Sequence, residues 1–448
     1  MSTATDMTSL RRISGTLLAL GVPLAVGFVS QMAISFTDAA LVARLGTVEL
    51  TGVTLALSVF SVVMLLGLGV VTAVSPEVAT AFRTGAHEEA RGWYAQGSWL
   101  AAGLGLLGAL VLVNTRGILV LLGQSPELAE VAGRYNTGAA LGLPFFLLYV
   151  NVRSTLSSVG RPKPLTWIML AAVPVNLVVG YLAVFGIGGV PGFGVAGAGW
   201  SSTVVRGLII VAALAVVHRK VFPDAVRWRP DIRALGQLAR VGAPIGVRIL
   251  LGEGFLPILA FFMARFGAEA TTAHAVALRL VTLISVVALG FSSAAATMSA
   301  WARADRSPTA LRGLRSALLL VGGCYAVVLS AATAGAFGFV VDVLFGLRDV
   351  GAKSALHVLL PLVLGYFVLD TLGTMLNGYL VGMQDTLLPT VVVMVSFWVV
   401  GLGTGLLLSG PVGMGFSGLW VGMAVAALLV FVFNVARSGY HAGASSDR

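Results

Sequence analysis

Long runs of apolar residues without a charge limit what this chain can fold into more than any other feature of its sequence. Three of these runs cover residues 55–74, 99–113 and 391–408. They approach the roughly 20 residues with which a helix crosses the hydrocarbon of a bilayer, and they lack the alternating polarity of membrane β-strands. Only 10% of all residues are charged, whereas soluble proteins carry roughly 25%. We therefore expect an all-α polytopic membrane protein.

The positions of the spans and of the basic residues together predict a topology. With the N-terminus inside, 18 of the 28 Lys and Arg residues fall in inside connections and 6 in outside ones. Basic residues concentrate on the cytoplasmic side of membrane proteins, so we expect both termini in the cytoplasm and the chain in the inner (plasma) membrane. The net charge of +10 then indicates membrane lipids as neighbours and no nucleic acid. We expect twelve spans, which begin near residues 14, 52, 95, 136, 165, 195, 241, 272, 314, 354, 387 and 415.

The sequence lacks the residue patterns of a catalytic site. It has no His/Cys metal spacing, no activated serine constellation and no phosphate-binding loop. We therefore expect no enzyme activity and no cofactor. We also expect the protein to be a monomer. Cys324 is the only cysteine, so no disulfide forms within the chain, and its place in an apolar run favours a buried thiol.

The chain reads as two similar halves joined by a charged linker. The segment 218–233, HRKVFPDAVRWRPDIR, lies at the middle of the sequence. A single offset aligns GVPLAV at Gly21 with GAPIGV at Gly242, and ALVARLG at Ala40 with FFMARFG at Phe261. One offset that holds for separated segments favours internal duplication. We expect six-helix lobes at 1–217 and 234–448, related by a pseudo-two-fold axis along the membrane normal, with a cavity between them.

Three acidic residues lie deep within the predicted spans, namely Asp38, Glu253 and Asp370. A carboxylate in hydrocarbon costs several kcal/mol, so it faces a cavity, forms an ion pair, or takes up a proton or a cation. Asp38 shares one helical face with Gln31 and Ser35, which precede it by seven and three residues.

Asp370 shares a helical face in the same way with Thr374 and Asn377. Both polar stripes offer clustered oxygen ligands that suit a small hard cation as well as a proton. The alternative is an ion pair within the membrane that only holds helices together. Its basic partner would be one of the arginines within the spans, which are Arg153, Arg206, Arg248 and Arg279. We interpret Arg153 as structural and expect the other three to extend toward the lipid headgroups.

Several segments, in their order and spacing, resemble the multidrug and toxic compound extrusion (MATE) family, and specifically its NorM-like branch. The opening PLAVGFVSQMAISFTDAALVARLG resembles the family's first helix and places Asp38 on its acidic position. MARFGAEATTAHAVAL places His274 on the family's histidine, and LGEGFLPILAF places Glu253 on its seventh-helix glutamate. YFVLDTLGTMLNGYLVGMQD resembles the tenth helix, with Asp370 on the second aspartate and Tyr366 one turn before it.

This resemblance implies a secondary active antiporter that exports cationic amphipathic compounds in exchange for Na⁺ or H⁺, by alternating access between two lobes. The acids would bind the coupling ion and release the substrate in turn. If helices seven and ten pack as in the family, Glu253 and Asp370 face one cavity, and this pair of carboxylates would hold Na⁺ or share a proton.

The chain departs from the NorM-like pattern at one position. In AAVPVNLVVG, Asn176 matches a family asparagine, but Ala172 stands where NorM-like members often have another, which weakens a Na⁺ site in the first half. The DinF branch tends to have an acid at the position of Asn176 and a non-acid at that of Glu253, and this chain follows NorM at both.

Three other functions compete with this interpretation. A lipid-linked oligosaccharide flippase of the same wider superfamily would show about fourteen spans and a more cationic cavity. A membrane-embedded enzyme would need an acid/base or nucleophile set near one membrane face. A receptor or scaffold is not favoured by the duplication and the cavity acids.

Overall fold

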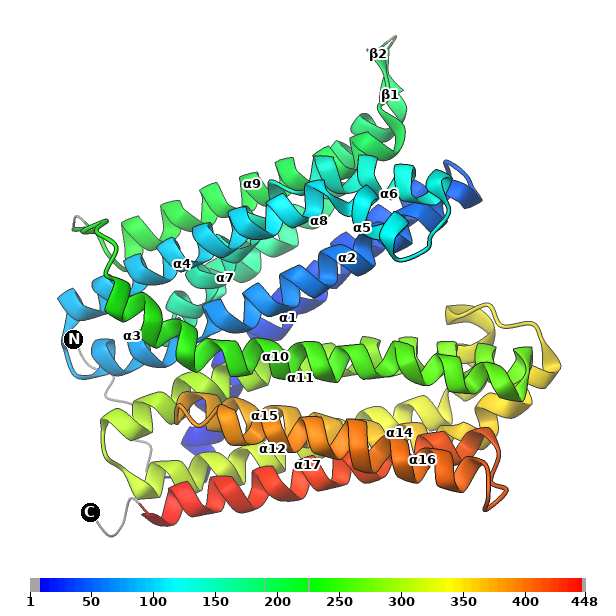
Figure 1. The fold of residues 1–448 in the computed structure, drawn as a ribbon. Helices are drawn as coiled ribbons and strands as arrows, with labels where there is room; N and C mark the ends of the chain where they lie inside the picture. The colour runs from blue at the N-terminus through cyan, green and yellow to red at the C-terminus, as the bar shows by residue number, and fades with distance from the viewer. Residues whose placement is uncertain (1–8, 189, 225, 445–448) are drawn as a thin grey trace. The chain divides into compact units, whose positions relative to one another are not determined.

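Long α-helices make up nearly all of the fold, as the apolar runs predicted. The computed structural model describes residues 9–188, 190–224 and 226–444. In Figure 1 the long helices run roughly parallel to one another within each part of the chain. The helices of the first half are α1 Leu10–Ala43, α2 Thr47–Thr72, α3 Val74–Arg83, α4 His87–Val113, α5 Thr115–Leu121, α6 Pro126–Ala139, α7 Gly142–Ser158, α8 Lys163–Phe185 and α9 Gly194–Lys220. Strands β1 Gly186–Ile187 and β2 Val190–Pro191 pair between α8 and α9.

The second half repeats this all-helical character. Its helices are α10 Ile232–Met263, α11 Ala268–Ala304, α12 Pro308–Gly335, α13 Phe337–Phe339, α14 Val350–Gly382, α15 Leu387–Met394, α16 Leu402–Ser409 and α17 Phe416–Ala444. The 3-10 turn η1 Ala264–Phe266 follows α10, and the wider π turns η2 Val340–Leu344 and η3 Val395–Gly401 interrupt the helices near α13 and between α15 and α16.

The described residues form eleven candidate membrane spans, or twelve if the bent pair of α6 and α7 is counted as one span, as the sequence predicted. Eleven helical segments are long and apolar enough to cross a bilayer, and α6 and α7 pass the same test only together, with a bend of 49° at their junction. Because α15, η3 and α16 run on without a break, they act as one span over Leu387–Ser409. The fourteen spans expected of a flippase are therefore not found in the described part of the chain.

The helices pack into two compact units, whose boundaries lie within α1 and α10. One unit is residues 26–246, and the other combines the described residues up to Ala25 with those from Val247 onward. Accordingly, Ile13 and Leu17 of α1 are buried among residues of α11 and α12, while Leu238 of α10 is buried in a cluster with residues of α4 and α7. These units differ in their boundaries from the lobes predicted at 1–217 and 234–448, and those lobes remain a prediction.

Two small-residue contacts show why the beginnings of α1 and α10 pack where they do. In one unit, α11 crosses α1 so closely that a Cβ on Gly290 would overlap the backbone of Ala25. In the other unit, α2 crosses α10 so closely that a Cβ on Gly69 would overlap the backbone of Gly246. The offset that aligns the two halves of the sequence carries Gly69 onto Gly290 and Ala25 onto Gly246. The same helix contact is therefore made twice, which supports the internal duplication.

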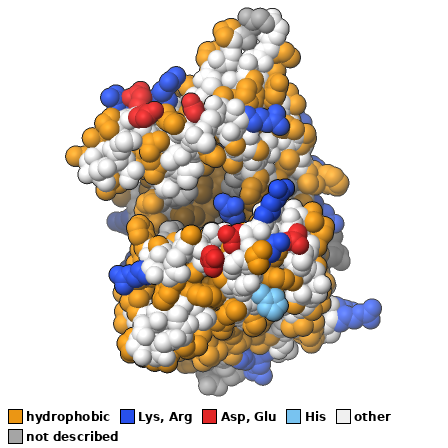
Figure 2. Space-filling view, turned by 90° about the vertical axis from the view of Figure 1, so that its right-hand side faces the viewer, with side chains coloured by type: hydrophobic (Ala, Val, Ile, Leu, Met, Phe, Trp, Pro, Cys, Tyr) orange, Lys and Arg blue, Asp and Glu red, His pale blue; other side chains and the backbone are white. Residues whose placement is uncertain are grey.

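Large apolar side chains cover much of the surface along the helices. On α4, Leu106, Leu107 and Leu110 are 55–65% exposed, as expected where lipid replaces water as the solvent. Charged side chains gather instead at the helix ends, as Figure 2 shows for the end face that carries the β1–β2 hairpin. Cys324 is exposed on α12, so the expectation of a buried thiol was wrong. Its helix turns it outward from the packed core.

Candidate functional site

The carboxylate of Asp38 is held by two neutral donors from neighbouring helices. Asn176 of α8 donates a hydrogen bond from Nδ2 to Oδ1 of Asp38, at 2.8 Å. Ser202 of α9 donates from Oγ to Oδ2, at 3.1 Å. Neutral donors orient a carboxylate without cancelling its charge. Asp38 thus keeps the capacity to bind a proton or a cation.

Arg206 adds a positive charge near this carboxylate. It follows Ser202 by one turn of α9 and is attracted electrostatically to Asp38, although no direct ion pair joins the two among the described contacts. Its guanidinium lies 4.7 Å from the centroid of the Phe60 ring, and Nη1 is buried without a hydrogen-bond partner among the residues that the structure describes. The expectation that Arg206 extends to the headgroups was therefore wrong, because α9 turns this side chain toward the interior.

The polar stripe on α1 does not supply the partners of Asp38. Ser35 donates from Oγ to the backbone carbonyl of Gln31, at 3.3 Å, which is a common use of a hydroxyl within a helix. Among the described contacts, neither side chain meets Asp38. Of the residues that the sequence singled out in this half, the structure brings Asn176 to the carboxylate.

In the second half, Asp370 of α14 is half-buried and is attracted electrostatically to Arg248 of α10. Tyr366 lies one turn before Asp370 on α14 and is buried, whereas Thr374 is half-buried one turn after it. Asn377, a further turn along, is buried. The side chain of Glu253 lies outside the described residues, so its proximity to Asp370 stays a prediction.

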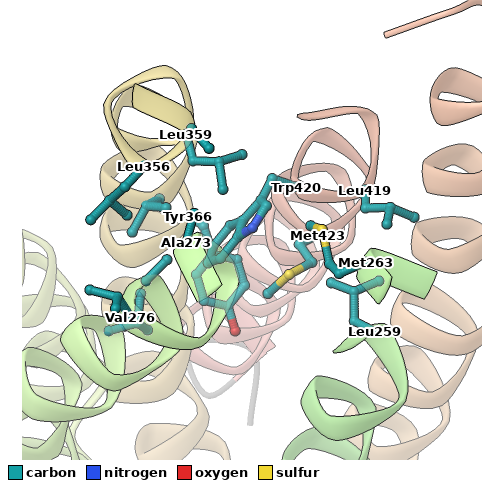
Figure 3. Packing of buried hydrophobic residues seen from close by; sticks show 14 of the residues in the cluster. Leu259, Met263, Ala273, Val276, Leu356, Leu359, Tyr366, Leu419, Trp420 and Met423 are labelled. Carbon is teal, nitrogen blue, oxygen red and sulfur yellow. The ribbon is translucent and has the colours of Figure 1, made fainter. Parts of the chain in front are cut away.

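An aromatic group packs next to this stretch of α14. Trp420 of α17 lies edge-on to Tyr366, with ring centroids 6.1 Å apart, and edge-on to His274 of α11, at 5.7 Å. Figure 3 shows the rings of Tyr366 and Trp420 side by side, with Met263 and Met423 close by. His274, which the resemblance places on the family's histidine, is therefore buried within the protein.

Sequence reasoning missed Ser202 and Trp420. Ser202 lies in the run GWSSTVVRG, where two adjacent serines and a threonine differ only in the helix face they occupy, and that face is set by packing. Trp420 lies in an apolar run and carries no signal of its own. Its Nε1 is buried without a hydrogen-bond partner among the described residues, a feature that only the structure reveals.

Comparison with known proteins identifies relatives over the whole length of the chain. The MatE family model matches residues 23–182 and 244–407, and the starts of the two matches are related by the offset of the internal duplication. A "Probable multidrug resistance protein NorM" of Bradyrhizobium diazoefficiens is 33% identical, over 93% of this chain and 92% of its own. One of the same name from Deinococcus radiodurans is 30% identical, over 98% of this chain and 96% of its own.

Solved structures share the fold at lower sequence identity. The outward-facing conformation of a multidrug resistance MATE family transporter superposes with a TM-score of 0.85 at 19% identity, and covers both chains completely. A eukaryotic MATE transporter superposes with a TM-score of 0.84 at 19% identity, over 98% of this chain and 99% of its own.

Proposed function

This chain belongs to the MatE family of multidrug efflux transporters, and on that premise we propose that it is a secondary active antiporter that exports cationic amphipathic compounds in exchange for Na⁺ or H⁺. It is a multi-pass membrane transporter and not an enzyme. We further propose that it works as a monomer in the inner (plasma) membrane, with both termini in the cytoplasm.

The observation that supports coupling most directly is the environment of Asp38. A carboxylate is expensive within a membrane span. The donors that hold this one, Asn176 and Ser202, are neutral, and Arg206 attracts it without a direct ion pair among the described contacts. A proton or a small cation is the ligand that completes such a site at the least electrostatic cost. We therefore assign Asp38 the role of binding the coupling ion in the first half.

We assign Asp370 and Glu253 the corresponding role in the second half. Two carboxylates that share a cavity of low dielectric do not both stay ionised cheaply, so they share a proton or hold Na⁺ between them. Tyr366, Thr374 and Asn377 would supply further oxygen ligands from the same face of α14.

Competition between the two ligands then drives transport. Entry of the coupling ion neutralises the acids and weakens their attraction for a cationic drug, and loss of the ion restores that attraction. This linkage is reciprocal, because each ligand lowers the affinity for the other by the same factor. Alternating access between the two lobes would expose the acids to opposite sides of the membrane in turn.

Uptake of a fluorescent organic cation into everted vesicles, which corresponds to efflux from the intact cell, tests this proposal. Vesicles are given either a Na⁺ gradient at equal pH or a pH gradient without Na⁺, so that each coupling ion is tested alone. We expect one of the two gradients to drive transport, and expect Asp38→Asn and Asp370→Asn to reduce the initial rate by about tenfold or more, which corresponds to roughly 1.4 kcal/mol.

Glu127→Gln is the matched control, because Glu127 is an exposed acid in the first turn of α6, and it should transport like the wild type. If neither gradient drives efflux, the antiporter proposal is wrong. If both aspartate variants retain full gradient-driven efflux at equal expression, the acids hold helices together and the coupling site lies elsewhere.

A further inference from the structure

A pocket of about 330 Å³ opens at the helix ends of the unit formed by residues 26–246. It lies between the end of α4, α5, α6 and the beginning of α9. This end face carries both basic and acidic side chains and is visible in the part of Figure 2 with the β1–β2 hairpin. Its lining includes the charged residues Arg116, Glu130 and Arg134 and the apolar residues Val113 and Trp200.

Two glycines of α6 shape the walls of the pocket. A Cβ on Gly133 would lie 3.0 Å from Cβ of Arg116, so the missing side chain lets the arginine lie against α6. A Cβ on Gly138 would lie 2.8 Å from the backbone nitrogen of Trp200, so α6 and α9 approach closely there. The pocket is thus set by packed backbone rather than by a loop.

The charges in the pocket leave one guanidinium uncompensated. Arg116 forms an ion pair with Glu130, with 3.0 Å between Nη1 and Oε2. Arg134, one turn after Glu130 on α6, has no ion-pair partner among the described residues. An arginine presents a planar set of N–H donors that matches phosphate oxygens. The pocket therefore suits a phosphate group with one net negative charge.

Apolar stripes lead from the pocket along the lipid-facing surface. On α9, Trp200, Val204, Leu208 and Val211 recur on one face and are 48–67% exposed. On α4, the similarly exposed residues are Leu106, Leu110 and Val113. Trp200 belongs to both the pocket and the stripe, and tryptophan side chains favour the membrane interface, where one end of the ring is wet and the other apolar.

We propose that this pocket binds an anionic phospholipid, with the phosphate on Arg134 and the acyl chains along the stripes of α4 and α9. On the predicted topology the lipid belongs to the outer leaflet. A free phosphate ion would satisfy Arg134 as well, but it makes no use of the adjoining apolar stripes. The site is separate from the transport acids and does not depend on the identity of the coupling ion.

Native mass spectrometry of the full-length protein in detergent tests the site. Phosphatidylglycerol is titrated against the wild type and against Arg134→Gln, and phosphatidylcholine, whose headgroup is zwitterionic, serves as the lipid control. We expect the wild type to bind phosphatidylglycerol more tightly than phosphatidylcholine, whose choline cation offsets the charge of the phosphate. Arg134→Gln should weaken binding of one phosphatidylglycerol about five- to tenfold and binding of one phosphatidylcholine less. Arg44→Gln, an exposed arginine at the same end outside the pocket, should bind both lipids like the wild type.

Two results would overturn the proposal. An equal loss of phosphatidylglycerol binding in Arg44→Gln would mean that lipid is attracted by general charge and not by the pocket. Displacement of phosphatidylglycerol by millimolar inorganic phosphate alone would mean that the pocket is a site for free phosphate. The melting temperature of Arg134→Gln is measured in parallel, and a value equal to that of the wild type shows that any lost binding is not caused by unfolding.

Discussion

At the scale of single residues, Asp385 joins the turn after α14 to the last turns of α17. Its Oδ2 accepts from Nε of Arg437, at 2.5 Å, and lies 2.8 Å from Nε2 of His441. The hydrogen bond with His441, followed by that with Arg437, lowers the pKa of Asp385 below its ordinary value, although partial burial acts in the opposite direction. The ionised carboxylate is therefore the form that stabilises this contact.

We expect Asp385→Asn to lower the free energy of unfolding at pH 7 by on the order of 1 kcal/mol, and so to lower the melting temperature. Because the pKa is depressed in the folded state, this stabilisation is fully present above the ordinary aspartate pKa of about 3.9 and is lost as the pH falls through the lower folded value. Thermal unfolding in detergent at pH 7 and near pH 3.5 measures the difference in stability between the variant and the wild type. If this difference is as large near pH 3.5 as at pH 7, the ionised carboxylate of Asp385 is not what stabilises the contact.

Asp224→Asn provides the comparison for this measurement. Asp224 pairs with Arg91 at 3.0 Å, but its side chain is 78% exposed. Exposed ion pairs contribute little, so this variant should unfold within a few tenths of a kcal/mol of the wild type. If Asp224→Asn lowers the unfolding free energy as much as Asp385→Asn does, both variants act through the change in net charge and not through a specific contact.

The identity of the acids within the spans could be read from the sequence, whereas their partners could not. Asp38 and Asp370 stand out because a carboxylate is rare in an apolar run. Ser202 and Arg206 reach the region of Asp38 only because α9 packs with one particular face inward, and a span that is apolar on all sides carries no periodic signal for that face.

At the scale of helices, the crossing of α2 and α10 depends on Gly69. A Cβ there would overlap the backbone of Gly246, and overpacking of this kind costs about 1–3 kcal/mol. Gly69→Ala should therefore lower the melting temperature, even though alanine favours a helix over glycine by about 1 kcal/mol. Differential scanning fluorimetry of purified protein measures the shift.

Gly103→Ala in α4 is the matched substitution, because nothing lies within 4 Å of the position of its Cβ. There only the gain in helix propensity applies, so its melting temperature should equal or exceed that of the wild type. Equal shifts for the two variants would show that the α2–α10 crossing relaxes without cost.

The sequence analysis predicted the helices but not their irregularities. Every span expected from the apolar runs is present among the described residues, with starts within about ten residues of the structure's. The 49° bend between α6 and α7 was not predicted, although Gly142 and Pro144 follow it directly, and a proline at 144 cannot donate a hydrogen bond to the carbonyl of Ala140. The π turn within Leu387–Ser409 was not predicted either.

At the scale of the whole molecule, the predicted topology places the α3–α4 turn inside and the α5–α6 turn outside. In a Cys324→Ser background, Glu88→Cys and Gln124→Cys each introduce one exposed thiol. An impermeant maleimide added to intact cells should label Gln124→Cys, and should label Glu88→Cys only after permeabilisation. The reverse pattern would invert the topology, and labelling of both from outside would overturn the twelve-span count.

The duplication could be recognised from the sequence. The sequence does not show, however, that the beginning of α1 packs with the second half and the beginning of α10 with the first, an arrangement that we call the exchange of helix beginnings. The offset that carries Gly21 onto Gly242 was visible in matching letters, and the two MatE matches repeat it. Nothing in the amino-acid sequence indicates that the first turns of α1 pack with α11 rather than with the helices of their own half. That choice depends on small residues such as Ala25 and Gly290, which are common throughout the chain.

This exchange of helix beginnings has a consequence for how the protein is made. Ala25 leaves the ribosome about 265 residues before its partner Gly290, and at roughly 5–20 residues per second this delay lasts about 13–53 s. During that interval the first turns of α1 are inserted but have only lipid or the insertion machinery to contact. The packing of these first turns therefore waits for late synthesis, and a nascent chain that stops in the middle leaves the beginning of its oldest helix without its partner.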